Sequence, residues 1–138
     1  MTALTASRNT LERAGEVRGY PVKASTACYM GGLAVLNAGY AAPGTTATGL
    51  IAIGLFEEDA DNSAGAAGAI TVRVKQGVFL FNNSAAGDAI AQADVGADCY
   101  IVDDNTVAKT TATGTRSRAG IIAAVETAGV WVQLGLGV

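Results

Sequence analysis

The chain has 138 residues, of which half are hydrophobic and 15% are charged, and it contains two cysteines and no histidine. This length suits one domain with its own core and leaves no room for separate cofactor and substrate domains. Without histidine the chain lacks the commonest general base and the commonest metal ligand. The net charge of −3 argues against nucleic-acid binding through general electrostatics.

The start of the chain is more basic than the rest. Arg8, Arg13, Arg18 and Lys23 recur every five positions, a spacing that follows neither a helix face nor a strand face. We therefore expect an extended basic arm over residues 1–20, followed by a single β domain over 21–138. The polar beginning and the lack of a long apolar run predict no membrane span and synthesis in the cytoplasm of the producing cell.

Short apolar runs separated by turn residues fill the remainder. Residues 70–75 and 130–134 alternate cleanly between apolar and polar, which is typical of half-buried strands. Residues 77–81 are apolar on both faces and predict either a central strand or a strand with one face against a partner. Residues 50–53 and 121–125 are two more short apolar runs, and residues 99–102 and 106–110 predict a hairpin with its turn at 103–105. Short strands at this spacing favour an all-β sandwich or barrel.

The sequence also repeats itself. The pentapeptide Thr-Thr-Ala-Thr-Gly occurs at 45–49 and again at 110–114, and each copy is followed by an apolar run and then an alternating strand. A Cys-Tyr pair precedes each copy, at 28–29 and at 99–100. Repeats mark architecture, so we expect two similar half-motifs over about 21–76 and 77–138.

No motif for catalysis is present. The chain has neither a nucleophile elbow nor a phosphate-binding loop, and its serines have no histidine to activate them. The acidic run 57–62 lacks the ligand spacing of a calcium loop and is read as a solvated turn. Cys28 and Cys99 are expected to be free, buried thiols. We therefore expect no enzyme activity, no cofactor and no catalytic or metal site.

The order of several segments resembles the small capsid cement, or head decoration, proteins of tailed bacteriophages. These segments are Gly-Val-Phe at 77–79, Gly-Asp-Ala at 87–89, Tyr-Ile-Val-Asp-Asp at 100–104, the threonine-rich stretch 110–115, and the runs 120–123 and 130–134. The resemblance covers roughly residues 22–134. It implies a compact β-sandwich or β-barrel of β-tulip or jelly-roll type. It also implies a structural role on the outer face of an icosahedral head, where the protein bridges neighbouring major capsid protein subunits as a homotrimer in preference to a homodimer.

Several side chains are candidates for these contacts. The arm residues Arg8, Arg13, Arg18 and Lys23 are expected to dock on the capsid. Trp131 is read either as a residue packed beneath a loop or second sheet, or as an interface anchor; Arg116 and Arg118 form either a solvated turn or a docking contact. The full expected contact set is Val78, Phe79, Leu80, Phe81, Arg116, Arg118 and Trp131. The alternative function is a surface-displayed carbohydrate- or receptor-binding β module, for which the four tyrosines are scattered rather than clustered.

Overall fold

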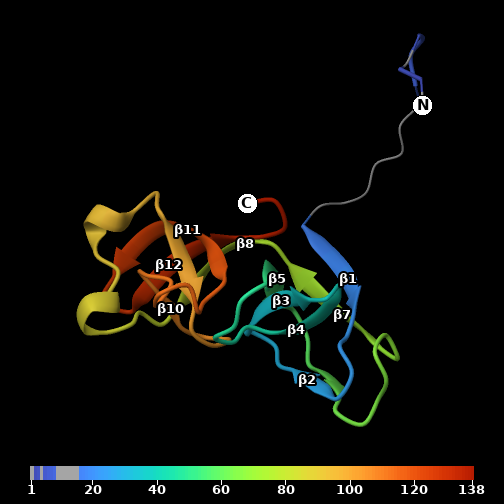
Figure 1. Cartoon of the computed structure of the whole chain (residues 1–138), viewed down its shortest axis with the longest axis horizontal. Coiled ribbons are helices and arrows are strands. Elements are labelled where there is room, and N and C mark those ends of the chain that lie inside the picture. The colour runs from blue at the N-terminus through green and yellow to red at the C-terminus, as the bar shows by residue number, and fades with distance from the viewer. Residues whose placement is uncertain (1, 4, 9–15) are drawn as a thin grey trace.

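The structure is a computed structural model that describes residues 2–3, 5–8 and 16–138 (Figure 1). The described chain is all-β, as expected, with two short 3-10 turns as its only helical elements. The strands are β1 (Val17–Pro21), β2 (Thr26–Cys28), β3 (Leu33–Asn37), β4 (Tyr40–Pro43), β5 (Ile51–Phe56), β6 (Ala60–Asn62), β7 (Thr71–Lys75), β8 (Gly77–Phe81), β9 (Asp98–Ile101), β10 (Val107–Ala108), β11 (Arg118–Glu126) and β12 (Gly129–Leu134), and the turns are η1 (Ala86–Asp88) and η2 (Gln92–Asp94).

Two five-stranded antiparallel sheets make up the body. The first sheet has the order β1-β7-β5-β3-β4, the second has the order β10-β9-β11-β12-β8, and β2 pairs with β6 in a small separate sheet. The first sheet and the second form two lobes that lie side by side (Figure 1), and only Gln76 separates β7 of one from β8 of the other.

The two sheets have the same topology. When β1, β3, β4, β5 and β7 are matched in chain order with β8, β9, β10, β11 and β12, the spatial order of the strands is identical, with every pairing antiparallel. The β2–β6 pair is an addition to the first half. The expectation of two similar half-motifs is therefore confirmed, and their boundary falls at Gln76.

Local details repeat as well. In each half the strand after the Thr-Thr-Ala-Thr-Gly loop has a bulge. In β5 the bulge is at Ile53, opposite β3, and in β11 it is at Ala119, opposite β9, the equivalent of β3. Both copies of the pentapeptide occupy the equivalent loop, between β4 and β5 and between β10 and β11. The Cys-Tyr echo does not correspond: Cys28 ends the additional strand β2, whereas Cys99 lies in β9, the equivalent of β3.

The core has two parts. One lies within the first sheet and includes Phe56, Val72 and Val74. The larger one lies within the second sheet and also takes in Leu33 and Val35 from β3, so the two sheets share an apolar layer as in a small β-sandwich. In each half an isolated parallel bridge forms at or next to the two outer strands of the sheet, Val22 with Ala41 and Asn82 with Thr106, and neither sheet closes into a barrel.

The first sheet begins earlier than expected. Val17–Pro21 pairs along its whole length with β7, so residues 17–20 belong to the sheet and not to an arm. The sequence concealed this strand because Arg18, Gly19 and Pro21 interrupt any apolar alternation. The remainder of the expected arm includes residues 9–15, which lie outside the described residues.

Candidate functional site

The strand β8 lies at an edge of the second sheet, not at its centre. It pairs with β12 on one side only, and its side chains alternate between solvent and core. Val78 and Leu80 face outward with 48% and 40% of their surface exposed. Phe81 is buried and Phe79 packs against the same core, so these two expected contact residues face the interior and are corrected to core positions.

The exposed side of β8 continues across the next two strands as one apolar surface. Leu80 lies opposite Trp131, which lies opposite Ala124; Val78 lies opposite Gln133, which lies opposite Ile121. Opposite residues on antiparallel strands project from the same face of a sheet. We call this surface the outer face, and it consists of Val78, Leu80, Ile121, Ala124, Trp131 and Gln133. Among these six residues only Gln133 is polar and none is charged; the exposed Glu126, two positions after Ala124 in β11, projects from the end of the same face.

An ion pair borders the outer face on the side of β9. Asp98, which lies opposite Ile121, holds the Arg118 guanidinium, with Asp98 Oδ1 2.8 Å from Arg118 Nε. Arg118 Nη1 also donates a hydrogen bond to the Val138 carbonyl oxygen. The outer face thus has an apolar centre and a charged rim, the distribution seen in many protein–protein interfaces.

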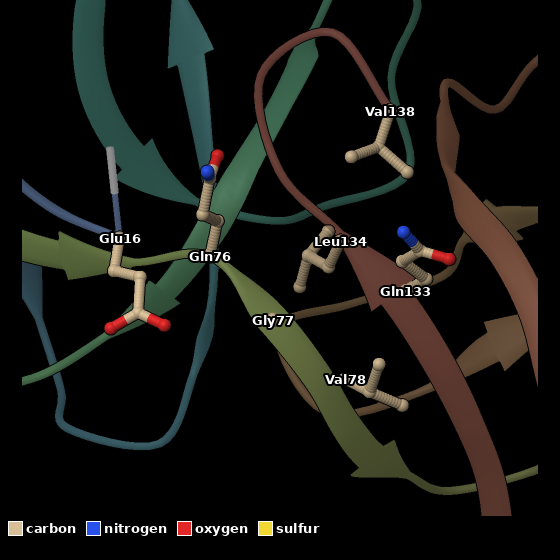
Figure 2. A pocket seen from close by; sticks show the side chains of 7 residues that line it. All are labelled: Glu16, Gln76, Gly77, Val78, Gln133, Leu134 and Val138. Carbon is tan, nitrogen blue, oxygen red and sulfur yellow. The ribbon is translucent and has the colours of Figure 1, made fainter. Parts of the chain in front are cut away.

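A cavity of about 240 Å³ lies at the end of the outer face near Gly77 (Figure 2). Its walls combine the apolar side chains of Val78, Leu134 and Val138 with the amides of Gln76 and Gln133. Glu16 supplies the charged side chain in this lining, and its carbonyl oxygen accepts a 2.9 Å hydrogen bond from the Gln76 N–H.

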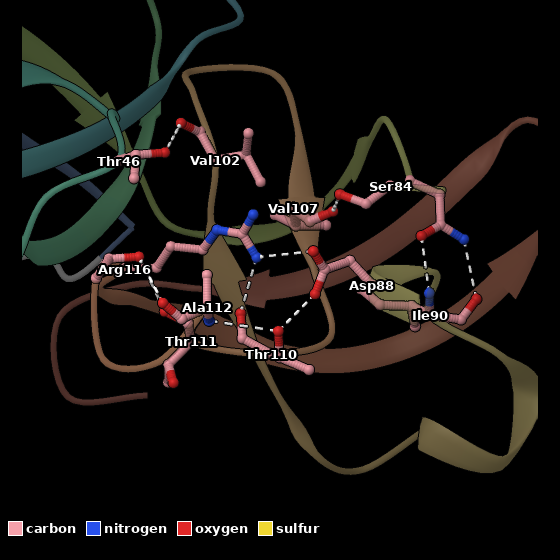
Figure 3. A network of polar contacts seen from close by, with 12 residues as sticks. Thr46, Ser84, Asp88, Ile90, Val102, Val107, Thr110, Thr111, Ala112 and Arg116 are labelled. Atoms are coloured by element: carbon pink, nitrogen blue, oxygen red, sulfur yellow. Dashed lines mark hydrogen bonds and ion pairs between the residues drawn. The ribbon is translucent and has the colours of Figure 1, made fainter. Parts of the chain in front are cut away.

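Arg116 is part of an internal polar network, not a free docking charge (Figure 3). Its Nη1 lies 3.3 Å from Asp88 Oδ2 and donates to the Thr110 carbonyl oxygen, and only 14% of its side chain is exposed. Thr110 Oγ1 donates a 2.5 Å hydrogen bond to Asp88 Oδ1. The Thr110 hydroxyl, followed by the Arg116 guanidinium, holds the pKa of Asp88 below its usual value. The network ties the second pentapeptide loop to η1.

The expected basic arm is divided by the structure. Arg18 lies in β1 opposite Val74, and Lys23 follows that strand, where its N–H donates to the Ala41 carbonyl oxygen. Arg8 is exposed. Arg13 lies outside the described residues. Of the described members, Arg18 therefore belongs to the sheet and Lys23 is bonded to it, so neither lies in an extended arm.

The acidic turn uses its carboxylates separately. Glu58 forms an ion pair with Arg73 at 2.6 Å, Asp59 accepts a hydrogen bond from the Met30 N–H, and Asp61 accepts one from the Ser63 N–H. Hydrogen bonding to the Ser63 hydroxyl, followed by that to the Ser63 N–H, lowers the pKa of Asp61. Within the described ranges no three acidic or cysteine side chains gather as they would around a metal ion. Among the same residues no helix has the length and hydropathy to cross a membrane.

Sequence reasoning missed Ile121, Ala124 and Gln133 as members of the outer face and Glu16 as a member of the cavity lining. Ile121 and Ala124 were expected only as parts of an apolar run, because the bulge between Ile122 and Ala124 sets which of them face outward. Glu16 reaches the cavity only because β1 aligns with the end of β7. The apolar character of residues 77–81 was the signal that did identify β8.

Comparison with known proteins adds no relative: no family model, no curated protein and no solved structure matches this chain.

Proposed function

We propose that this protein is a structural virion protein that binds the outer surface of an icosahedral phage head and stabilises it by bridging major capsid protein subunits. The observation that carries the proposal is the outer face: an uncharged patch centred on Leu80 and Trp131, presented on a rigid sheet. Tryptophan and large aliphatic side chains dominate the energetics of protein interfaces.

The duplicated scaffold supports the same role. A protein that stiffens a shell needs a folded body that holds its shape and more than one surface that adheres. Two sheets of the same topology, joined through one residue and a shared core layer, provide such a body. Each contact can be weak because the shell is a dense array, and linked contacts multiply their strength.

The proposal includes self-association and a basic N-terminal contact. A homotrimer is preferred to a homodimer, with the outer face open to either a second copy or the capsid. Arg8 and Arg13 precede the sheet and are assigned to the capsid contact. Arg116, Phe79 and Phe81 are omitted, because Arg116 is engaged in an internal network and the two phenylalanines face the core.

Imaging of undecorated phage heads mixed with purified protein tests the proposal. Wild-type protein should occupy regular positions on the shell. Leu80→Lys should reduce occupancy, since a lysine would have to be desolvated in the apolar centre. Tyr29→Lys is the matched control, because Tyr29 is an exposed residue on the β2–β3 turn, outside the outer face. Heads that stay bare with wild-type protein would refute the proposal.

A further inference from the structure

Along the free edge of β8 lies a short row of backbone N–H and carbonyl groups that have no hydrogen-bond partner among the described residues, and we call this row the lane. At one end of this lane the Gln76 N–H donates to the Glu16 carbonyl oxygen. At the other end the Asn82 N–H donates to the Asn105 carbonyl oxygen, and the Asn82 carbonyl accepts from the Val107 N–H. At both ends of the lane, therefore, an even-numbered residue directs its backbone hydrogen-bonding groups away from β12: Gln76 at one end and Asn82 at the other.

In an extended strand, alternate residues direct both their N–H and their carbonyl group to the same side. Val78 and Leu80 lie between Gln76 and Asn82, so their backbone groups face the same open edge. No backbone hydrogen bond from another described element reaches them. The lane thus offers two donors and two acceptors, directly beside the two exposed apolar side chains of β8.

The other outer strands carry features that discourage strand addition. β1 contains Arg18 and Pro21, β4 ends in Pro43, and β10 has only two residues. Charge, proline and shortness are the usual means by which proteins protect sheet edges. β8 has five residues, with no proline and no charge. Among the outer strands of the two five-stranded sheets in the described part of the chain, β8 therefore has the edge best suited to accept another strand.

The cavity beside Glu16 defines the chemistry of that strand. Val78, Leu134 and Val138 offer apolar walls, and Glu16 is the charged residue of the lining. This combination fits a lysine or arginine side chain, whose apolar stem packs while its charged end meets an acid. The segment's other side chains would meet Leu80 and Trp131, which favours apolar residues at alternate positions.

From this geometry we propose that β8 binds an extended segment of the major capsid protein by strand addition. The segment is apolar at alternate positions and carries a basic residue that enters the cavity beside Glu16. This inference rests on the proposed function for the identity of the partner. The lane itself defines the mode of binding, with main-chain hydrogen bonds from Val78 and Leu80 giving affinity and the cavity giving selectivity.

The test uses the full chain and a synthetic peptide as the probe. The peptide is acetylated and amidated Thr-Val-Thr-Val-Thr-Lys, and its control has glutamate in place of lysine. Nuclear magnetic resonance should show that the lysine peptide shifts the Val78 and Leu80 amide signals and slows their hydrogen exchange. The glutamate peptide should bind about threefold more weakly, as expected for a partly exposed ion pair. Glu16→Gln should abolish that difference.

A matched pair of variants isolates the backbone contribution. Leu80→Pro removes an N–H that faces the open edge and leaves the β8–β12 ladder intact, whereas Leu80→Ala shortens the side chain but keeps the donor. The proline variant should bind the lysine peptide about fivefold more weakly than the alanine variant, the effect of one lost hydrogen bond. Val78→Pro and Val78→Ala form a second pair if Leu80→Pro does not fold.

Three results would overturn the inference. They are unchanged Val78 and Leu80 signals at millimolar peptide, equal binding by the proline and alanine variants, and slow exchange of both amides before any peptide is added. The third result would show that the chain's own N-terminal segment or a second copy fills the lane. None of these measurements uses phage heads, so failure here is distinguishable from failure of head binding.

Discussion

Gly54 and Gly120 occupy the same position in the two halves of the molecule. Each follows the bulged residue of its strand and lies directly under a carbonyl oxygen of the neighbouring strand. A Cβ added at Gly54 would lie 2.4 Å from the Lys75 oxygen, and one added at Gly120 would lie 2.2 Å from the Gln133 oxygen. The two halves thus share the same close backbone contact even though the surrounding sequences differ.

This close approach makes both glycines intolerant of a side chain. Gly54→Ala and Gly120→Ala should each lower the free energy of unfolding by about 1–3 kcal/mol, because the sheet has to shift to relieve the contact. Urea denaturation of the two variants measures the loss. Gly19→Ala is the control, since a Cβ there meets no atom within 4 Å. Equal stability of all three variants would show that the sheets yield to the added methyl group.

The sequence predicted the strands whose pattern is local and missed what depends on long-range pairing. Clean alternation located β7 and β12, and the repeated pentapeptide located the two equivalent loops. The Cys-Tyr dipeptide failed as a marker because two residues do not specify a strand partner. β1 was missed for the same reason: its pairing with β7, not its own composition, makes it a strand.

The site was predictable only in part. An apolar run such as 77–81 is compatible with a central strand or an edge strand, and the strand order alone decides between them. That order exposes Val78 and Leu80 and buries Phe81. Arg116 resembled a free surface charge because its partner Asp88 lies 28 positions earlier in the chain.

The Asp88 network should make stability depend on pH. The pKa of Asp88 is lower in the folded protein than the value of about 4 expected in the unfolded chain. Its contribution is therefore present above about pH 4 and is lost as the pH falls through the folded-state value. Wild-type protein should lose more stability than Asp88→Asn between about pH 6 and pH 3.

Comparison of two further variants separates the causes of this dependence. Thr110→Val removes the hydroxyl donor, which is the largest influence on the pKa, and should reduce the pH dependence more than Arg116→Lys. Thermal unfolding at several pH values gives the slopes. Identical slopes for wild type and Asp88→Asn would mean that Asp88 titrates alike in the folded and unfolded chains.

Both thiols should be unreactive while the protein is folded. Cys28 and Cys99 are free and buried, and burial raises the pKa of each to about 11. At pH 8 roughly one thiol in a thousand is then ionised, and the thiolate is the reactive form. A chromogenic disulfide reagent should detect no thiol in native protein and both thiols after unfolding in guanidinium chloride.

The two cysteines also belong to different core regions, so their bonding state should not depend on redox conditions. Cys28 packs within the first sheet and Cys99 within the second. Two thiols should therefore be recovered from unfolded protein that has never met a reductant. Rapid modification of either cysteine in the native state would contradict the burial of that side chain.

The start of the first sheet at Val17 distinguishes two N-terminal deletions. Removal of residues 1–15 leaves β1 intact and should change the melting temperature little. Removal of residues 1–20 eliminates most of β1, uncovers its partner strand β7, and deletes Tyr20, which packs against the core. The longer deletion should cost at least about 2 kcal/mol through lost hydrogen bonds and burial.

The shorter deletion is therefore the one that tests the basic arm. It removes Arg8 and Arg13 while Arg18 and Lys23 stay in the folded body. If the arm contacts the capsid, this variant should remain folded and occupy phage heads less than wild type does, with the difference narrowing as salt screens the charges. Unchanged occupancy would leave the outer face as the contact that holds the protein to the shell.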